Sequence, residues 1–168
     1  ETKTFVAEVN QLTQNIADVN EAISSFPADA RPSDLLDQRD QLVNKLAEQV
    51  QVSTIEQSDG ALNVFIGNGQ GVVVGNQNSA LTAVVDPEDP RKLDITLAAG
   101  GAVATITDAL VGGKIGGLND FQNTVLDVAQ NTIGQIAVGA AVQLNIQHRL
   151  GQDLNGNLGG DFFTEPTI

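Results

Sequence analysis

The sequence predicts an α+β fold: an elongated antiparallel helical bundle or coiled coil that carries a small inserted antiparallel β-sheet domain. Apolar residues repeat with helical spacing over residues 1–50 and again over residues 114–150. Between them, residues 51–113 alternate apolar and polar side chains around glycine-containing turns, which is typical of strands. A turn-rich tail, residues 151–168, completes the predicted domains, and we expect it to lead to a further domain.

The first helix is predicted from a heptad pattern. Apolar residues follow one another at steps of four and three from Phe5 to Phe26, which fills both core positions of successive repeats. The polar residues between them, Asn10 and Asn20 included, are expected to face water. Pro27 cannot continue the helix. The seam residues expected from this segment are Phe5, Val9, Leu12, Ile16, Val19 and Ile23.

A second helix is predicted over residues 34–50. The connection to the first helix is short, so the two are expected to pack as an antiparallel hairpin. Arg39 falls within the apolar stripe and has two interpretations. Its stem lies over aliphatic surface with the guanidinium in water, or it forms an ion pair with Asp120 or Asp127. The expected seam residues are Leu35, Leu42 and Leu46.

The insert is predicted from a change of period to two. Asp59-Gly60 and Asn68-Gly69 separate alternating runs, and such pairs are a strong hairpin signal. Residues 51–107 are therefore expected to form one sheet of five or six short strands. A sheet of this size is marginal alone, so we expect it to lean on a helix or to close on itself. The glycines within residues 112–117 indicate a tight backbone junction or a hinge.

The third helix is expected to run over residues 115–150 without interruption, because glycine brackets a long stretch that contains no proline. Residues 128–147 include no charged side chain, but glutamine and asparagine interrupt the run too often for a membrane span. A helix that is apolar around most of its circumference needs protein neighbours on several sides. Its expected seam residues are Leu118, Phe121, Val125, Ile133, Ile136 and Leu144.

Composition excludes several classes of function. The chain has 21 acidic residues against 8 Lys and Arg, a net charge of -13, and no basic patch. This balance argues against partners such as nucleic acid or an anionic membrane surface. Cysteine is absent, which removes disulfides, thiolate metal sites and a cysteine nucleophile. Because the chain starts at Glu1 and not at Met, we expect it to be part of a longer chain.

No enzyme is predicted, and no catalytic residue or cofactor. His148 is the single histidine, expected as a solvated or hydrogen-bonded side chain near a helix end, so no histidine-based relay with a spare histidine can be assembled. Asp153, Asn155 and Asn157 have the ligand spacing that begins a calcium loop, but the glycine and glutamate of such a loop are missing. An ordinary turn is the favoured interpretation of these residues, and a weak cation site is the alternative.

A resemblance rests on four segments, namely residues 35–42, 112–121, 145–157 and 160–163. In this order they resemble the family of flagellar hook-associated protein 1, the hook–filament junction protein of bacterial flagella, and residues 145–163 are the most specific part. The resemblance implies an interior fragment of a structural subunit that is exported by the flagellar type III apparatus and serves motility outside the cell. The implied partners are copies of itself in a ring, the flagellar hook protein, the second junction protein and an export chaperone. The resemblance implies no catalytic residue and no cofactor.

The functional hypothesis is a structural subunit of the bacterial flagellum at the hook–filament junction that acts by lateral helix packing and assembly. The predicted helices carry more apolar surface than three helices need, so copies or relatives would cover the remainder. The alternative, from a different class, is a secreted adhesin-like module that binds a ligand through the strand insert. Phe65 is the aromatic residue available there for such a role.

Overall fold

The computed structural model describes residues 1–164 and combines helices with antiparallel strands, which confirms the α+β prediction. The chain divides into two compact units, Glu1–Asn119 and the residues from Asp120 onward. The predicted bundle of residues 1–50 with 114–150 involves both units and stays a prediction. Of the predicted tail, residues 165–168 lie outside the described residues.

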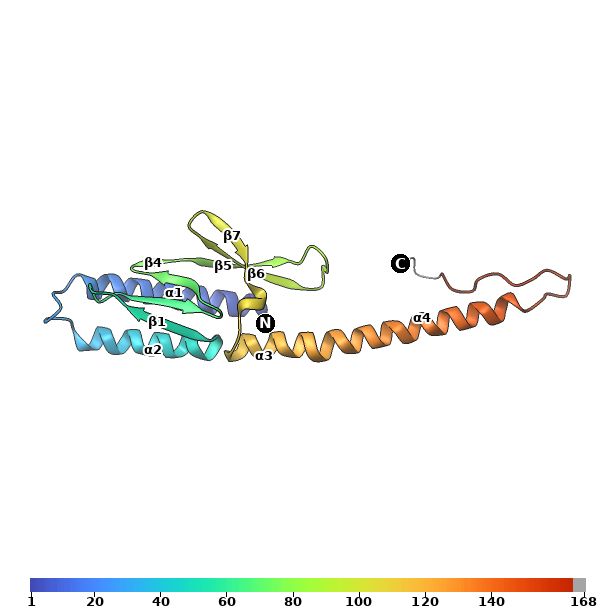
Figure 1. Ribbon diagram of the computed structural model, residues 1–168, viewed down its shortest axis with the longest axis horizontal. Helices are drawn as coiled ribbons and strands as arrows, with labels where there is room; N and C mark the ends of the chain where they lie inside the picture. The colour runs from blue at the N-terminus through green and yellow to red at the C-terminus, as the bar shows by residue number, and fades with distance from the viewer. Residues whose placement is uncertain (165–168) are drawn as a thin grey trace. The chain divides into compact units, whose positions relative to one another are not determined.

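Two helices lie side by side in the first unit, α1 (Thr2–Ser24) and α2 (Ser33–Gln49) (Figure 1). The heptad seam of α1 turns inward, with Leu12 partly buried and its other members buried. On α2, Leu46 is fully buried, whereas Leu35 and Leu42 are half-buried. Phe26 lies beyond the end of α1 and is exposed.

Two small antiparallel sheets cover these helices, where the sequence predicted one sheet of five or six strands. The first sheet has the strand order β1-β2-β3-β4, and the second has the order β5-β6-β7. The strands are β1 Val52–Glu56, β2 Leu62–Ile66, β3 Gln70–Val74, β4 Gln77–Asn78, β5 Ala80–Val85, β6 Leu93–Ala99 and β7 Ala102–Thr105. The prediction of a single sheet was wrong, because the strands form two separate hydrogen-bonded sheets that both pack on α1. The helix contacts β3 and β4 of the first sheet and β5 of the second. One helix thus supports two separate ladders.

One apolar core fills the space between the helices and both sheets. Its members come from every layer, for example Ile16 of α1, Leu46 of α2, Val64 of β2 and Ile95 of β6, all exposed by 1% or less. Full burial of an aliphatic side chain of this size stabilises a fold by about 1.5–3 kcal/mol. The small sheets therefore depend on the helices for their stability.

The glycine-rich segment that precedes the third helix is a tight junction, which decides between the two predicted interpretations. The backbone N–H of Gln51 donates to the carbonyl of Val111 at 2.9 Å, so the end of α2 and this segment lie in contact. A Cβ on Gly113 would lie 2.4 Å from the carbonyl carbon of Gln49, and its φ of +57° favours glycine as well. Only glycine fits this approach without rearrangement.

The third predicted helix forms as α3 (Gly113–Phe121), a π-helical turn (Gln122–Leu126) and α4 (Asp127–Arg149). The structure differs from the predicted uninterrupted α-helix at the π-helical turn. There the hydroxyl of Thr124 donates to the carbonyl of Asp120 at 2.6 Å and competes with the ordinary backbone bond. No helix within residues 1–164 has the length and apolar character needed to cross a membrane.

Candidate assembly surface

The middle of α4 is exposed and uncharged. Residues 131–140 are all exposed, and none of them carries a charge. Ile133 and Ile136 each expose 67% of their surface. Helical spacing places Ile133, Ile136, Ala140 and Leu144 on one face, which we name the α4 stripe. Large exposed apolar side chains on one helix face are typical of a surface that packs against other protein.

The seam residues predicted for the third helix have two kinds of surroundings. Leu118 packs against the core of the first unit. The others expose between 51% and 67% of their surface, namely Phe121, Val125, Ile133, Ile136 and Leu144. Their use as a packing seam requires further chains or segments and stays a proposal.

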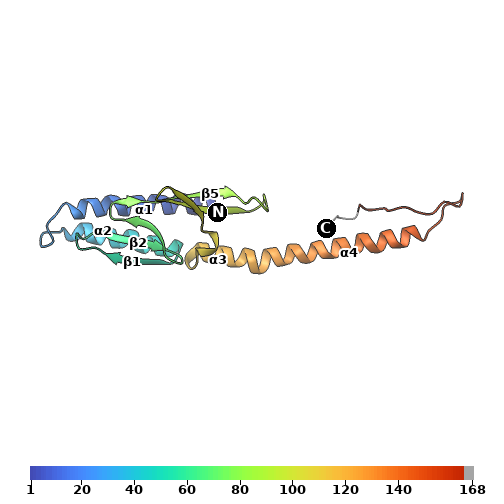
Figure 2. The ribbon, with the colours of Figure 1, turned by 45° about the horizontal axis from the view of Figure 1, so that its top comes forward.

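Beyond α4 the chain reverses and runs back beside the helix (Figures 1 and 2). The backbone N–H of Gly151 donates to the carbonyl of His148 at 3.0 Å and ends the helix. An antiparallel bridge between Gln152 and Leu158 then closes the reversal. We name residues 159–163, which follow it, the return segment.

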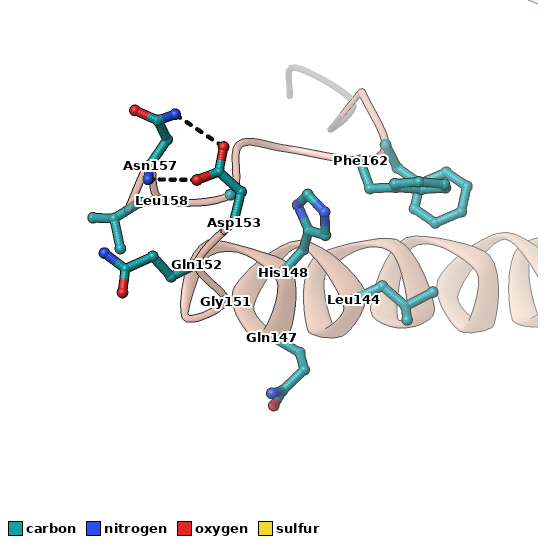
Figure 3. Close-up of a pocket in the computed structure, with 11 residues that line it drawn as sticks. Leu144, Gln147, His148, Gly151, Gln152, Asp153, Asn157, Leu158 and Phe162 are labelled. Atoms are coloured by element: carbon teal, nitrogen blue, oxygen red, sulfur yellow. Dashed lines mark hydrogen bonds between the residues drawn. The ribbon is translucent and has the colours of Figure 1, made fainter. Parts of the chain in front are cut away.

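Asp153 organises the reversal as a turn (Figure 3). Its carboxylate accepts hydrogen bonds from the backbone N–H groups of Asn155 and Asn157, both at 2.8 Å, and from the Asn157 side chain at 2.9 Å. The Asn157 side chain contributes most to holding the pKa of Asp153 below its usual value. The carboxylate therefore points at N–H groups of its own turn, which supports the turn interpretation. Across residues 1–164 no group of three acidic, histidine or cysteine side chains could hold a metal ion.

Calcium at millimolar concentration is expected to leave the thermal unfolding midpoint unchanged, because hydrogen bonds of the turn already occupy the Asp153 carboxylate. Asp153→Ala is expected to raise amide hydrogen exchange at Asn155 and Asn157 equally with and without calcium. The measurements are thermal unfolding and hydrogen exchange. A calcium-dependent rise of the midpoint that Asp153→Ala abolishes would instead establish a cation site.

Asn145 holds the return segment from the helix side. It is fully buried, although most of α4 is exposed. Its side-chain oxygen accepts hydrogen bonds from the backbone N–H groups of Phe162, at 2.9 Å, and Phe163, at 2.8 Å. Its side-chain nitrogen donates to the carbonyl of Phe163 at 2.8 Å. The carboxamide thus pairs with backbone N–H and C=O groups in the manner of a peptide group.

The last turn of α4 adds two further contacts to the return segment. Nδ1 of His148 lies 2.6 Å from the carbonyl oxygen of Gly160, the hydrogen-bonded placement near a helix end that the sequence predicts. Arg149 forms an ion pair with Asp161. The hydrogen bond from Arg149 lowers the pKa of the Asp161 carboxyl.

A cavity of about 670 Å³ lies between the end of α4 and the chain that reverses beside it (Figure 3). Its lining combines the apolar side chains of Leu144, Leu158, Phe162 and Phe163 with the polar ones of Gln147, His148, Gln152, Asp153 and Asn157. The ring of Phe162 stands edge-on to His148 and to Phe163, at centroid distances of 5.8 and 5.1 Å. Leu144 belongs both to the α4 stripe and to the lining of the cavity, so the two adjoin at this residue.

Two asparagines of α1 that were expected to face water are buried or bonded to strands. Asn10 pairs with both backbone groups of Leu81 at 2.8 Å. Asn20, which is fully buried, bonds both backbone groups of Leu62 and the carbonyl of Gly75. The prediction was wrong because a carboxamide offers a donor and an acceptor in the manner of a peptide group. The sequence did contain one sign of these contacts: both positions of the helix hold asparagine, which is a weak helix former.

Arg39 is buried as well, with 6% of its surface exposed. Its Nη1 donates to the carbonyl of Gly60 at 2.7 Å. The expectation of a guanidinium in water was wrong, because the turn between β1 and β2 supplies a backbone acceptor. The ion pair with Asp120 or Asp127, which belong to the other unit, stays a prediction. The aliphatic stem still covers apolar surface within the stripe.

An exposed, uncharged helix in one unit and an α+β core in the other define the class of this chain: a helix-rich structural protein that packs against other protein. Comparison with known families agrees with this class. The family model for the flagellar hook-associated protein FlgK helical domain matches residues 1–163. The chain belongs to this FlgK family.

Individual relatives show the same similarity. Flagellar hook-associated protein 1 of Salmonella typhimurium is 38% identical over 164 residues, which cover 95% of this chain and 30% of that protein. The protein of that name from Escherichia coli K12 is 37% identical over 163 residues, 94% of this chain and 30% of that protein. The solved flagellar hook junction protein FlgK of Burkholderia pseudomallei matches with a TM-score of 0.82 at 40% identity, over 94% of this chain and 29% of that one. The chain thus spans about 30% of the length of these relatives.

Proposed function

We propose that this chain is the helical part of a structural subunit at the junction between the hook and the filament of the bacterial flagellum. The relatives are named as hook-associated and hook junction proteins. The observation that carries the proposal is the exposed α4 stripe, which lies on a chain with a net charge of -13. The subunit performs no catalysis and needs no cofactor.

Lateral helix packing is the mode of action. Chains of strong like charge repel one another, so copies approach most easily along an uncharged helix. Burial of an exposed isoleucine stabilises a contact by about 1.5–3 kcal/mol. Residues 1–50 and 114–150 supply the helical bundle, residues 51–113 form its insert, and the tail leads to a further domain.

The proposed partners follow from this placement. Copies of the subunit form a ring, which meets the flagellar hook protein on one side and the second junction protein on the other. The subunit is exported by the flagellar apparatus, with an export chaperone, and works outside the cell. The adhesin-like alternative gains no support, since the named relatives are flagellar and Phe65 is half-buried within β2.

The double variant Ile133→Asp/Ile136→Asp in the full-length subunit is expected to abolish swimming, because two carboxylates at the centre of a packed helix face would be buried without partners. The measurement is the swimming halo in soft agar in a strain that lacks its own subunit. The halo should shrink to that of the strain without the subunit.

Val103→Asp is the matched control, because Val103 of β7 exposes 70% of its surface, close to the 67% of each isoleucine. It is expected to swim normally. The amount of subunit in the culture medium separates failed export from failed assembly. Wild-type swimming by the double variant would refute packing through the α4 stripe.

A further inference from the structure

We propose that Asn155 is a site of spontaneous chemical modification: its side chain cyclises onto the backbone nitrogen of Gly156 and is converted to aspartate and isoaspartate. The reaction is fastest where glycine follows asparagine, because no side chain shields the attacking nitrogen. The chain contains two such steps, Asn68-Gly69 and Asn155-Gly156, and their surroundings favour reaction at the second. The modification is independent of the proposed function, since water is its one further reactant.

The covalent steps balance without an oxidant or a catalyst. The backbone nitrogen of Gly156 attacks Cγ of Asn155 and forms a bond to it. The bond from Cγ to the side-chain nitrogen breaks, and that nitrogen leaves as ammonia with the proton of the Gly156 amide. Water then opens the resulting succinimide ring at either carbonyl carbon, which gives aspartate or isoaspartate. In isoaspartate the main chain is longer by one CH₂ group.

The two Asn-Gly steps occupy the same position of a turn, so they form a matched pair. The backbone N–H of Gly156 donates to the carbonyl of Asp153 at 3.1 Å. The backbone N–H of Gly69 donates to the carbonyl of Ile66, also at 3.1 Å. In each case asparagine is the third and glycine the fourth residue of a β-turn, and both asparagines are exposed. Their reactivity must therefore differ through what surrounds each turn.

The turn at Asn68 is bound to segments far away in the sequence. The backbone N–H of Asn68 donates to the carbonyl of Ala109 at 3.0 Å, and that of Gly67 donates to the carbonyl of Gln51 at 2.9 Å. Cyclisation requires the backbone around the asparagine to rotate. At Asn68 this rotation has to break both bonds and lift the turn off the first unit.

The hydrogen bonds around Asn155 come from the reversal itself. The Asp153 carboxylate accepts the backbone N–H groups of Asn155 and Asn157, and the side chain of Gln152 donates to the carbonyl of Gly156 at 2.6 Å. Asn155 contributes its backbone N–H to this turn, which leaves its side chain available for cyclisation. Residues 151–158 are all exposed, so groups that separate can bond to water, and local opening costs little.

Isoaspartate at position 155 is expected to loosen the reversal. The additional CH₂ group lengthens the main chain between Asp153 and Asn157, whose backbone N–H and side chain both bind the Asp153 carboxylate (Figure 3). The new carboxylate also lies within the same turn as Asp153 and repels it. Both effects weaken the hydrogen bonds that organise the turn.

The experiment follows deamidation of the full-length subunit by peptide mapping and mass spectrometry during incubation at mildly alkaline pH. A parallel sample in guanidinium chloride gives the rate of each Asn-Gly step in the unfolded chain. Folding is expected to slow the reaction of Asn68 by roughly 100-fold, because the backbone hydrogen bonds of Gly67, Asn68 and Gly69 have to open first. It should slow the reaction of Asn155 by about tenfold or less. An isoaspartate-specific methyltransferase should label the peptide that contains residue 155.

Asn155→Gln is the matched variant, because the longer side chain has to close a less favourable six-membered ring while the backbone N–H that bonds Asp153 is unchanged. Its peptide should stay unmodified, and only the reacted wild-type sample should show faster amide exchange at Asn157. Folding that slows Asn155 as strongly as Asn68 would overturn the assignment of the site. Unchanged exchange at Asn157 in the reacted sample would overturn the expected loosening.

Discussion

Asn20→Ala is expected to lower the free energy of unfolding of the first unit by about 3–5 kcal/mol, because it leaves several backbone groups without partners. Asn20 is fully buried on α1. Its side chain donates to the carbonyls of Leu62 and Gly75 at 2.8 and 2.7 Å and accepts from the N–H of Leu62 at 3.0 Å. The measurement is urea unfolding of this chain followed by circular dichroism.

Asn15→Ala is the matched control on the same helix. Asn15 accepts a hydrogen bond from Gln11 on the exposed side of α1, so its loss should cost about 0.5 kcal/mol or less. An effect of Asn20→Ala as small as that of Asn15→Ala would show that Asn20 does not hold β2 and the turn after β3 on α1.

Gly67→Ala is expected to destabilise the chain by about 3 kcal/mol or more, since it combines a forced left-handed backbone with a collision. Gly67 has a φ of +53°, and a Cβ there would lie 2.0 Å from the carbonyl oxygen of Ala109. That oxygen also accepts the backbone hydrogen bond of Asn68, at 3.0 Å, so it cannot move freely. Thermal unfolding measures the loss.

Gly69→Ala measures the backbone strain without the collision. Gly69 also has a positive φ, +102°, but a Cβ there meets nothing within 4 Å. We expect a loss of about 1–2 kcal/mol from backbone strain alone. Equal losses in the two variants would refute the claim that the turn after β2 is packed against Ala109.

Local patterns in the sequence were sufficient for the fold class. Residues close together in the sequence determine both the heptad of α1 and the Asp59-Gly60 and Asn68-Gly69 turns. Gly60 and Gly69 adopt the positive φ that such turns require, +89° and +102°. The division of the strands into two sheets depends instead on α1 contacts with segments far along the chain, and a periodicity does not contain that information.

The candidate surface was predictable in part. The absence of charge over residues 128–147 is visible in the sequence, and so is the need of that helix for neighbours. The hydrogen bonds of Asn145 to the return segment could not be predicted, because the sequence does not distinguish an asparagine that faces water from one that binds backbone. Its partners, Phe162 and Phe163, follow a chain reversal whose direction no local pattern determines.

The asparagine contacts of α1 have a consequence for the order in which the chain can fold. During synthesis α1 emerges before the strands, yet Asn20 and Asn10 bond strand residues that lie 42 and 71 positions later. Closure of such long loops is entropically costly and slows folding. The hairpin of α1 and α2 must therefore wait, with its apolar side uncovered, until the ribosome has released β5.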